Sequence, residues 1–187
     1  MRTFNKLTKE VAGLIDKNEV GIIPTDTIYG VVVSAMSPRT VEKIYTIKGR
    51  DRKKPMIVLI NSEKDLRKYF EIDCPQKVSD IWPARLSVVL NCEKYPHIHR
   101  GKETIAFRVP DHEELRKLIA KTGPLVAPSA NPEGRPPALT IGEAKTYFGS
   151  DVDFYVSGGR LSKKASTLVD FTDGEFNVLR EGDFTLG

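Results

Sequence analysis

The chain has 187 residues, of which 40% are hydrophobic and 29% are charged, a composition typical of a water-soluble globular protein. This length fits one domain, which we place at residues 1–187, and no apolar run approaches the roughly 18 residues needed to cross a bilayer. Lys and Arg outnumber Asp and Glu by 29 to 25, and the resulting net charge of +4 favours anionic ligands.

The N-terminal residues and the cysteines indicate the cellular compartment. The first residues return to polar side chains before an apolar segment forms, which argues against a cleaved secretory signal. Cys74 and Cys92 are too few for a disulfide scaffold or a cysteine zinc site, and we expect both to be free thiols. We therefore predict a cytoplasmic protein without a membrane segment.

The first half of the chain is predicted to alternate helices with strands. Ser37 and Pro38 are typical of the start of a helix, which should end near Lys48, and Asn61 or Ser62 should cap the next helix. Apolar residues at helical spacing indicate that an amphipathic helix opens the chain, namely Leu7, Val11, Leu14 and Ile15. Runs of β-branched residues predict buried strands at residues 20–23 and 57–60, with further strand structure up to residue 34.

The second half continues this alternation. Asp111 should cap one helix, and Thr140 with Glu143 matches the capping box of another. The segments 91–102 and 128–137 are predicted to be loops because polar, Gly and Pro residues dominate them. Strands are predicted at residues 86–90, 104–109, 125–127, 155–156, 166–169 and 176–179.

The order of these elements predicts the fold class. Alternating strands and helices are typical of an α/β domain with one twisted sheet flanked by helices. Some connections are too short to hold a crossover helix, so some neighbouring strands must be antiparallel. We therefore expect a mostly mixed sheet.

The common catalytic motifs are missing from the sequence. It contains no Gly-x-x-x-x-Gly-Lys-Ser/Thr phosphate loop, no Gly-x-Gly-x-x-Gly dinucleotide turn, no His-Glu-x-x-His metal helix and no Gly-x-Ser-x-Gly nucleophile turn. His97 and His99 form a pair in a polar loop, where a solvent-exposed role is more common than metal binding. Hydrolases and metalloenzymes of the common types are therefore disfavoured.

Polar side chains instead gather at the ends of the predicted strands, where open α/β sheets usually bind ligands. Between residues 48 and 54, five of the seven side chains are cationic and one is anionic, which suits a phosphate chain. We take ten residues as candidates for one shared site: Thr25, Thr27, Lys48, Arg50, Lys54, Arg108, Ser129, Asn131, Ser166 and Arg180.

Each candidate also has a simpler explanation that the sequence leaves open. A basic run beside a helix end is often a solvated surface that aids solubility. Thr, Ser, Asp and Asn commonly stabilise turns by bonding to the nearby backbone. Arg108 and Arg180 are consistent with surface charges as well as with a site.

Six motifs in order resemble those of the YrdC/TsaC family of threonylcarbamoyl-adenylate synthases. The resemblance extends from about residue 7 to residue 183, nearly the whole chain. The motifs are Pro24-Thr-Asp-Thr-Ile-Tyr-Gly30, Lys48-Gly-Arg50, Ile105-Ala-Phe-Arg-Val-Pro110, Ser129-Ala-Asn131, Ser166-Thr-Leu-Val-Asp170 and Leu179-Arg-Glu-Gly182.

This resemblance implies both a fold and a reaction. It implies an open α/β fold with a concave, basic cavity, and a nucleotidyltransferase that converts L-threonine, bicarbonate and ATP to threonylcarbamoyl-AMP and pyrophosphate. The product would serve t6A modification of tRNA at adenosine 37, with tRNA and the t6A transferase complex as downstream partners. Mg²⁺ is expected with ATP, held by phosphate oxygens and water rather than by a dedicated protein site.

Residue roles follow from the matching motifs. The resemblance implies catalytic roles for Lys48, Arg50, Ser129 and Asn131. It implies ATP binding by those four residues together with Lys54, Thr104 and Arg180. Contacts to threonine or bicarbonate would come from Thr27, Arg108 and Ser166.

Two departures and two alternative functions accompany this resemblance. Leu59 stands where many longer relatives have His, and Val126-Ala-Pro precedes Ser129 where many have Ser-Thr. The sequence resembles the short, single-domain form, without the extra C-terminal domain of longer relatives. An RNA-binding module that uses a basic concave surface is one alternative. A carbamoyl-adenylate-forming domain of the hydrogenase-maturation type is the other.

Overall fold

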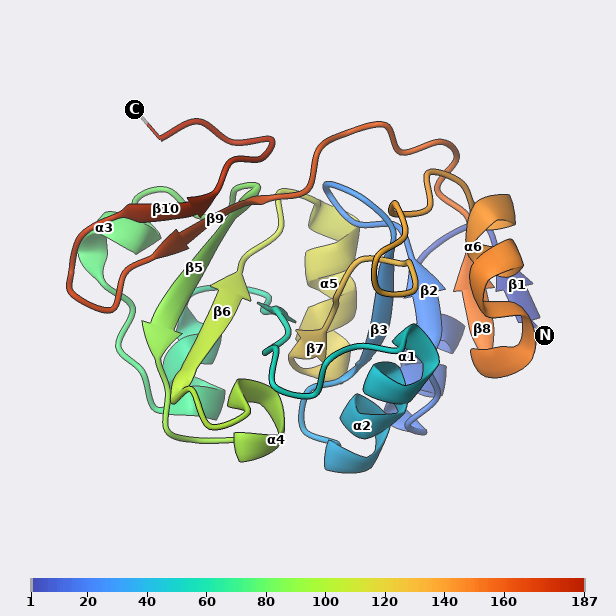
Figure 1. Cartoon of the computed structure of the whole chain (residues 1–187), viewed down its shortest axis with the longest axis horizontal. Coiled ribbons are helices and arrows are strands. Elements are labelled where there is room, and N and C mark those ends of the chain that lie inside the picture. The colour runs from blue at the N-terminus through green and yellow to red at the C-terminus, as the bar shows by residue number, and fades with distance from the viewer. Residues whose placement is uncertain (1, 187) are drawn as a thin grey trace.

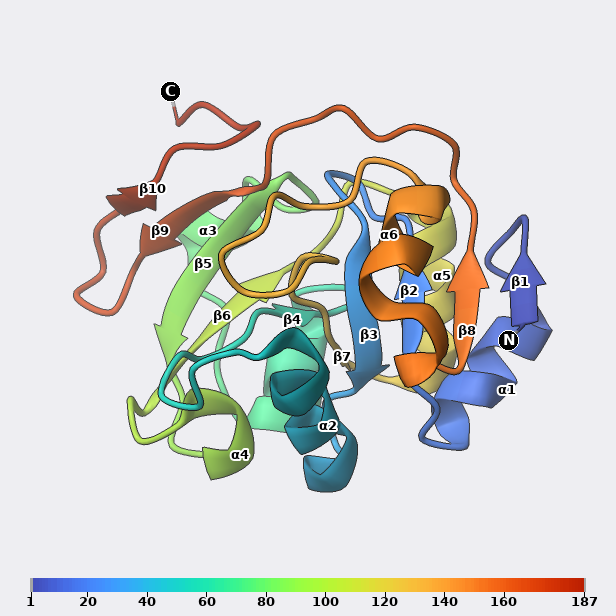
Figure 2. The ribbon, with the colours of Figure 1, turned by 45° about the vertical axis from the view of Figure 1, so that its right-hand side comes forward.

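A ten-stranded β-sheet runs through residues 2–186, the part of the chain that the computed structural model describes. Strands β1 and β8 lie at one end of the molecule, and β9 and β10 lie at the opposite end (Figures 1 and 2). In spatial order the strands are β1 (Arg2–Phe4), β8 (Phe154–Val156), β2 (Gly21–Ile23), β3 (Gly30–Ser34), β7 (Leu125–Val126), β4 (Val58–Leu59), β6 (Thr104–Arg108), β5 (Leu86–Asn91), β9 (Thr167–Asp170) and β10 (Asn177–Arg180).

The sheet mixes parallel and antiparallel pairs, as predicted. β1 with β8, β2 with β8, β4 with β6 and β5 with β9 are parallel, whereas the remaining neighbours are antiparallel. The central strand β7 pairs through Val126 with Val33 of β3 on one side and with Val58 of β4 on the other. These short strands therefore join the two halves of the sheet.

Helices cover both faces of the sheet. Successive valines of β3 alternate between two apolar clusters, Val32 in one and Val33 in the other, because side chains along a strand point to opposite faces. α1 and α5 pack together over the first cluster, and α2, α4 and α6 contribute to the second. The helices are α1 (Lys9–Asp16), α2 (Pro38–Lys48), α3 (Gln76–Ser79), α4 (Pro96–His99), α5 (Glu113–Thr122) and α6 (Ile141–Phe148).

Two predicted helix starts are confirmed by the structure. Pro38 is the first residue of α2 and Ser37 is its N-cap, although the Ser37 hydroxyl forms no capping bond. At α6, the Thr140 hydroxyl accepts a hydrogen bond from the backbone N–H of Glu143, and the Glu143 carboxylate accepts one from the backbone N–H of Leu139. The capping box is therefore present, with its return bond one residue before the cap.

Two predicted caps are wrong. His112, not Asp111, caps α5, because the Asp111 N–H donates to the carboxylate of Asp26 and so ties the preceding residue to another segment. Neither Asn61 nor Ser62 caps a helix, since the following segment is a π-helical turn, η1 (Leu66–Phe70), whose N-cap is Asp65. The Asp65 carboxylate accepts a hydrogen bond from the Asn61 N–H instead.

The sequence did not predict several short elements. Strand β1 is mostly exposed and is formed by pairing with β8, whose residues lie far along the chain. The predicted loop at 91–102 contains the short helix α4, and a 3₁₀ turn, η2 (Gly149–Asp151), follows α6. The predicted strand at 57–60 is reduced to the two residues of β4. Tertiary pairing, rather than local sequence pattern, determines these short strands.

Alternation along β5 and β6 positions the polar side chains of the site. Val88 and Phe107 point into the apolar cluster, whereas their neighbours Ser87, Ala106 and Arg108 line the opposite, concave face. Among residues 2–186, no helix is long and apolar enough to cross a bilayer.

Candidate functional site

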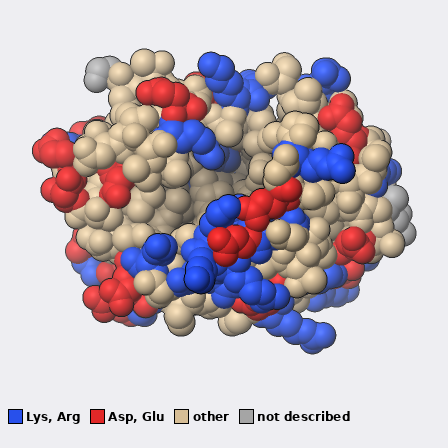
Figure 3. Space-filling model, in the orientation of Figure 1, with Lys and Arg blue, Asp and Glu red and all other residues tan. Residues whose placement is uncertain are grey.

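A cavity of about 410 Å³ lies between the two halves of the sheet. Figure 3 shows a hollow near the middle of the face of the molecule that is turned to the viewer. Lys and Arg side chains surround the hollow, with acidic side chains among them. Its walls come from β5, β6, β9 and β10, from the turn between β2 and β3, and from the segment that follows β7. The polar residues that line it are Thr25, Thr27, Arg50, Ser87, Thr104, Arg108, Ser129, Ser166 and Arg180, together with Tyr29.

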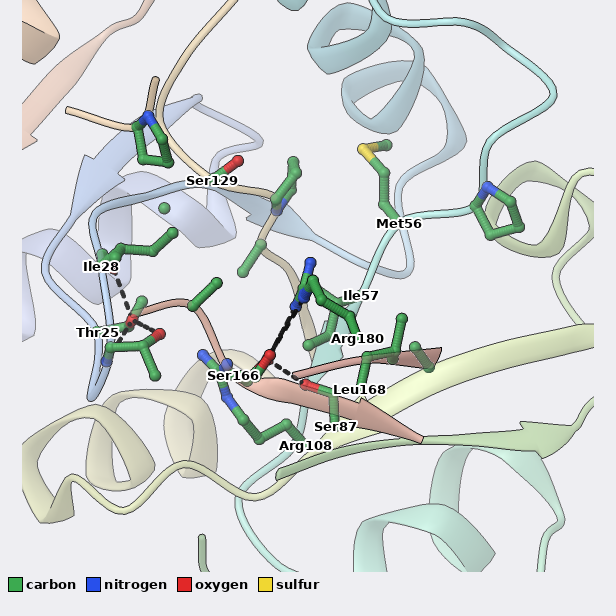
Figure 4. A pocket seen from close by; sticks show the side chains of 18 of the residues that line it. Thr25, Ile28, Met56, Ile57, Ser87, Arg108, Ser129, Ser166, Leu168 and Arg180 are labelled. Carbon is green, nitrogen blue, oxygen red and sulfur yellow. Dashed lines mark hydrogen bonds between the residues drawn. The ribbon is translucent and has the colours of Figure 1, made fainter. Parts of the chain in front are cut away.

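One wall carries a network of two serines and an arginine (Figure 4). The hydroxyls of Ser87 and Ser166 lie 2.7 Å apart. Arg180 Nη2 donates to the Ser166 carbonyl at 2.8 Å and to its hydroxyl at 3.4 Å. Burial lowers the pKa of Arg180. A Cβ on Gly182 would lie 2.3 Å from the carbonyl of Ala165, so only glycine lets the chain after β10 pack this closely.

A buried ion pair supports the neighbouring part of the same wall. Arg108 Nη2 lies 3.1 Å from Asp26 Oδ1, and both side chains are buried. The pKa of Arg108 is lowered by burial, which the Asp26 charge opposes and the Arg180 charge reinforces. Arg108 Nε is buried and has no hydrogen-bond partner within residues 2–186.

The turn between β2 and β3, which contains Asp26, forms an adjoining part of the wall. The Thr25 hydroxyl donates to the carbonyl of Ile28 at 2.6 Å and lies 3.2 Å from the Thr27 hydroxyl. The Thr27 N–H also donates to the Thr25 hydroxyl. The local bonding expected of such a turn is therefore present, and Thr25, Thr27 and Ile28 also line the cavity.

The basic loop, which we define as residues 49–55, brings Arg50 to the cavity. Gly49 adopts a left-handed conformation with φ of 59° and ends α2, which turns the chain toward the site. Arg50 donates through Nη2 to the carbonyl of Pro55 at 2.9 Å and through Nε to that of Lys54 at 3.4 Å. Arg50 and Pro55 both line the cavity.

Lys48 lies beneath the site rather than on its wall. Its side chain is buried, and its ammonium group donates to the carbonyls of Ser129 and Asn131. Burial is the main cause that lowers the pKa of Lys48 to about 7, and the nearby Arg50 charge adds to this effect. Lys48 therefore fixes the segment that carries Ser129.

Two other candidates also lie outside the lining. Lys54 pairs with the carboxylate of Glu133, which in turn accepts a hydrogen bond from the Asp51 N–H at 2.7 Å. Asn131 Oδ1 accepts a hydrogen bond from the Ser129 hydroxyl at 2.6 Å, so Asn131 orients Ser129 from behind. The remaining candidates share the one cavity: Thr25, Thr27, Arg50, Thr104, Arg108, Ser129, Ser166 and Arg180.

Sequence reasoning did not select Asp26 or Ser87 for the site. Asp26 is hidden in the Thr25–Thr27 turn, where an acidic residue has an ordinary role in turn formation. Ser87 carried a usable signal, because it is a polar residue in an otherwise apolar strand and is fully buried. Its partner Ser166 is 79 positions away, so only the pairing of β5 with β9 reveals the contact.

The cavity can bind an elongated anion. Arg50, Arg108 and Arg180 supply cationic donors to this lining, and the hydroxyls of Ser129 and Ser166 lie among them. Arginine forks bind phosphates and carboxylates through paired hydrogen bonds. Within residues 2–186, no three His, Cys, Asp or Glu side chains come together as metal ligands.

Comparison with known proteins identifies the family. Residues 13–182 match the family model Sua5_yciO_yrdC, described as "Telomere recombination". The chain is 37% identical over 185 residues to the threonylcarbamoyl-AMP synthase of Bacillus subtilis, covering 94% of this chain and 53% of that protein. It is 30% identical over 164 residues to the threonylcarbamoyl-AMP synthase of Pseudomonas fluorescens, covering 84% of this chain and 87% of that protein.

A solved structure agrees with the sequence comparisons. The crystal structure of Pyrococcus abyssi Sua5 complexed with L-threonine superimposes with a TM-score of 0.88 and 28% identity, covering 97% of this chain and 58% of that one. The chain therefore spans only about half the length of some relatives, including the Bacillus subtilis protein. Because the family model covers most of its residues and the fold agrees, the chain belongs to the Sua5/YciO/YrdC family.

Proposed function

We propose that this chain is a nucleotidyltransferase that forms threonylcarbamoyl-AMP and pyrophosphate from L-threonine, bicarbonate and ATP. The observation that carries the proposal is one cavity whose walls bear arginines and hydroxyls from the motifs that resemble those of threonylcarbamoyl-AMP synthases. The L-threonine in the matching Pyrococcus abyssi Sua5 structure supports threonine as one substrate.

The first step joins threonine to bicarbonate. The amine nitrogen of threonine forms a bond to the carbon of bicarbonate, and loss of water leaves a carbamate. Arg108 and Ser166 would bind the carboxylate or the carbamate, and Thr27 lines the same cavity. Positioning two small reactants in one confined space supplies much of the rate enhancement in such a reaction.

The second step transfers the adenylyl group. A carbamate oxygen attacks the α-phosphorus of ATP, and the bond from that phosphorus to the oxygen that bridges to the β-phosphate breaks, releasing pyrophosphate. Because the carbamate is already an anion, this step needs charge neutralisation more than a general base. Arg50 and Arg180 line the cavity as cationic donors for the phosphates, and the Thr104 hydroxyl is a further donor. The Ser129 hydroxyl donates to Asn131, which leaves it as an acceptor toward the nucleoside.

Lys48, Lys54 and Asn131 complete the predicted ATP site from outside its lining. Lys48 and Asn131 support Ser129 through the contacts described above, and Lys54 lies on the basic loop with Arg50. Mg²⁺ would enter with ATP as part of the substrate. A wall of arginines and hydroxyls suits a metal ion that phosphate oxygens and water coordinate.

The product would serve t6A modification of tRNA, with the t6A transferase complex as the downstream partner. We place the reaction in the cytoplasm, which the free thiols of Cys74 and Cys92 support, since cytoplasmic cysteines stay reduced.

Pyrophosphate release tests the proposal. The purified chain is expected to release pyrophosphate from ATP only when threonine and bicarbonate are both present, with the adenylate detected by mass spectrometry. Release that requires carbamoyl phosphate would instead support a carbamoyl-adenylate-forming domain. Tight binding of structured RNA without any pyrophosphate release would support the RNA-binding module.

A further inference from the structure

Asp26 is a buried acidic residue directly behind the cavity wall. Its side chain is 0% exposed, and its two carboxylate oxygens have separate roles. Oδ2 accepts a hydrogen bond from the Asp111 N–H at 3.2 Å, which ties the turn before β3 to the start of α5. Oδ1 forms an ion pair with Arg108 Nη2 at 3.1 Å, but this buried oxygen accepts no hydrogen bond within residues 2–186.

The backbone carbonyl of Asp26 accepts two further hydrogen bonds from cationic side chains. Arg85 Nε donates to it at 3.1 Å, and Lys163 Nζ donates to it at 3.4 Å. Two side-chain donors therefore hold the backbone of Asp26, and the Asp111 N–H holds its carboxylate. A carboxylate positioned in this way attracts the guanidinium of Arg108 and restrains its orientation.

Arg108 has a buried donor without a partner in the described part of the chain. Its side chain is 5% exposed and lines the same cavity as Ser166. Its buried Nε has no hydrogen-bond partner within residues 2–186. Buried donors of arginine are normally satisfied, so an unused one beside a cavity indicates a ligand acceptor.

The charges at this wall fit a ligand with one negative charge. Asp26 neutralises Arg108 within a buried pair, and Arg180 beside Ser166 forms no ion pair within residues 2–186. We propose that Asp26 is a positioning residue that fixes the Arg108 guanidinium against the wall, so that Arg108 binds the carboxylate of the amino-acid substrate. This inference rests on the proposed function, because it takes threonine as that substrate.

The test begins with Asp26→Asn. Asparagine keeps the shape of the side chain and an acceptor for the Asp111 N–H, but it removes the charge that faces Arg108. We expect the KM for threonine to rise roughly 10- to 100-fold, the range associated with one misplaced charge-assisted hydrogen bond. The KM for ATP should stay within about 3-fold, since Arg50 and Ser129 keep their contacts.

Asp153→Asn is the matched control. The Asp153 carboxylate also accepts a backbone hydrogen bond, from Val20 at 2.7 Å, and also pairs with a cation, Lys43, but it does not line the cavity. The KM values of the Asp153→Asn variant for threonine and for ATP should equal those of the wild type. A variant of Asp26 that raises both KM values by one common factor would indicate a general structural role and overturn the proposal.

A second readout is independent of activity. The Nε–Hε signal of Arg108 in a proton–nitrogen NMR spectrum can be assigned with Arg108→Lys. It should shift when threonine is added to the wild type, and in Asp26→Asn it should move or broaden before any addition. If the wild type releases no pyrophosphate, the proposed function fails, whereas the signal still tests whether Asp26 fixes Arg108. An unchanged Arg108 signal in Asp26→Asn would overturn the inference.

Asp26→Glu provides a test if Asp26→Asn does not fold. It retains the charge that faces Arg108, but it displaces the carboxylate by one methylene. We expect a smaller increase in the KM for threonine, about 3- to 10-fold, again with little change for ATP. A wild-type KM for threonine together with a wild-type Arg108 signal in this variant would also overturn the proposal.

Discussion

At the scale of single residues, neighbouring cations of the basic loop have different surroundings. Arg50 lines the cavity and is oriented by two backbone carbonyls, whereas Lys53 is exposed and does not line it. Lys48 is buried under the same loop. Sequence position alone places these three cations within six residues, so their effects must be separated by substitution.

Arg50→Ala should reduce threonine-dependent pyrophosphate release roughly 30- to 1000-fold, the usual cost of removing one charge-assisted contact to a sheltered phosphate. The matched control Lys53→Ala should retain nearly full activity. Both variants should melt close to the wild type, because neither side chain belongs to the core. Similar, modest losses that fade with added salt would show that the loop attracts anions only diffusely.

Lys48→Met tests the buried ammonium group through the pH dependence of stability. Burial lowers the pKa of Lys48 in the folded chain to about 7, against 10.5 for an ordinary lysine, so the unfolded chain binds this proton more tightly. The free energy of unfolding should therefore rise with pH from about 7 to about 9, by about 1 kcal/mol per pH unit relative to Lys48→Met. Urea denaturation at several pH values measures this difference.

The control and the pH window follow from other groups. Lys53→Met should follow the wild-type curve, because Lys53 is exposed. Burial also raises the pKa of the Cys74 thiol to about 11, so stability falls above about pH 9 as unfolded thiols ionise, but this fall is common to the wild type and Lys48→Met and cancels in their difference. Parallel curves for the wild type and Lys48→Met would contradict the prediction.

At the scale of elements, Glu133 links the basic loop to the segment after β7. Its carboxylate pairs with Lys54 and accepts the Asp51 N–H, and its own N–H donates to the Lys48 carbonyl at 2.8 Å. The hydrogen bond from Lys54 is the main cause that lowers the pKa of Glu133. Glu133 and Lys48 together hold the basic loop against the segment after β7, so that Arg50 and Ser129 line the same cavity.

Glu133→Gln should loosen the basic loop without unfolding the chain. Trypsin should cleave after the basic residues of the loop several-fold faster, and the KM for ATP should rise by about 3- to 10-fold, because an exposed ion pair contributes only modestly. Glu175→Gln is the control, since Glu175 pairs with Lys77 on another part of the surface at 2.8 Å. Equal cleavage rates in both variants and the wild type would contradict a linking role.

At the scale of the whole molecule, the cavity depends on how the two halves of the sheet are held together. Phe107 of β6 is fully buried, pairs with Val58 of β4 and Val88 of β5, and packs edge-to-face on Phe70 with ring centroids 4.7 Å apart. Its strand neighbour Arg108 lines the cavity. Core packing on one face of β6 thus fixes the site on the other.

Phe107→Ala should lower the free energy of unfolding by about 3–5 kcal/mol, the usual cost of truncating a fully buried phenylalanine. Val178→Ala is the control, because Val178 is 46% exposed and its truncation should change stability by less than about 0.5 kcal/mol. Urea denaturation of both variants provides the measurement. A loss below about 1 kcal/mol for Phe107→Ala would show that this packing contributes little to holding the two halves of the sheet together.

The success of the sequence predictions follows the range of the interactions. Thr140, Glu143, Pro38 and the buried Val11, Leu14 and Ile15 of α1 are confirmed, because capping and helical periodicity act within a few residues. Leu7 lies before the Thr8 N-cap, outside the helix. Asp111 was wrong as a cap because its N–H bonds to Asp26, 85 positions away. The two-residue strands and β1 likewise depend on partners that local pattern does not reveal.

The sequence by itself determined the α/β class, the order of most elements and, through its ordered motifs, the family. Only the tertiary structure decided which polar groups share the cavity wall, and it placed Lys48, Lys54 and Asn131 outside that wall. It also brought Ser87 to Ser166 and Asp26 to Arg108. The physical reason is that helix caps and periodicity depend on residues close together in the sequence. The contacts of the site form only when distant strands pair, and burial then leaves their charges and hydroxyls no partners except one another.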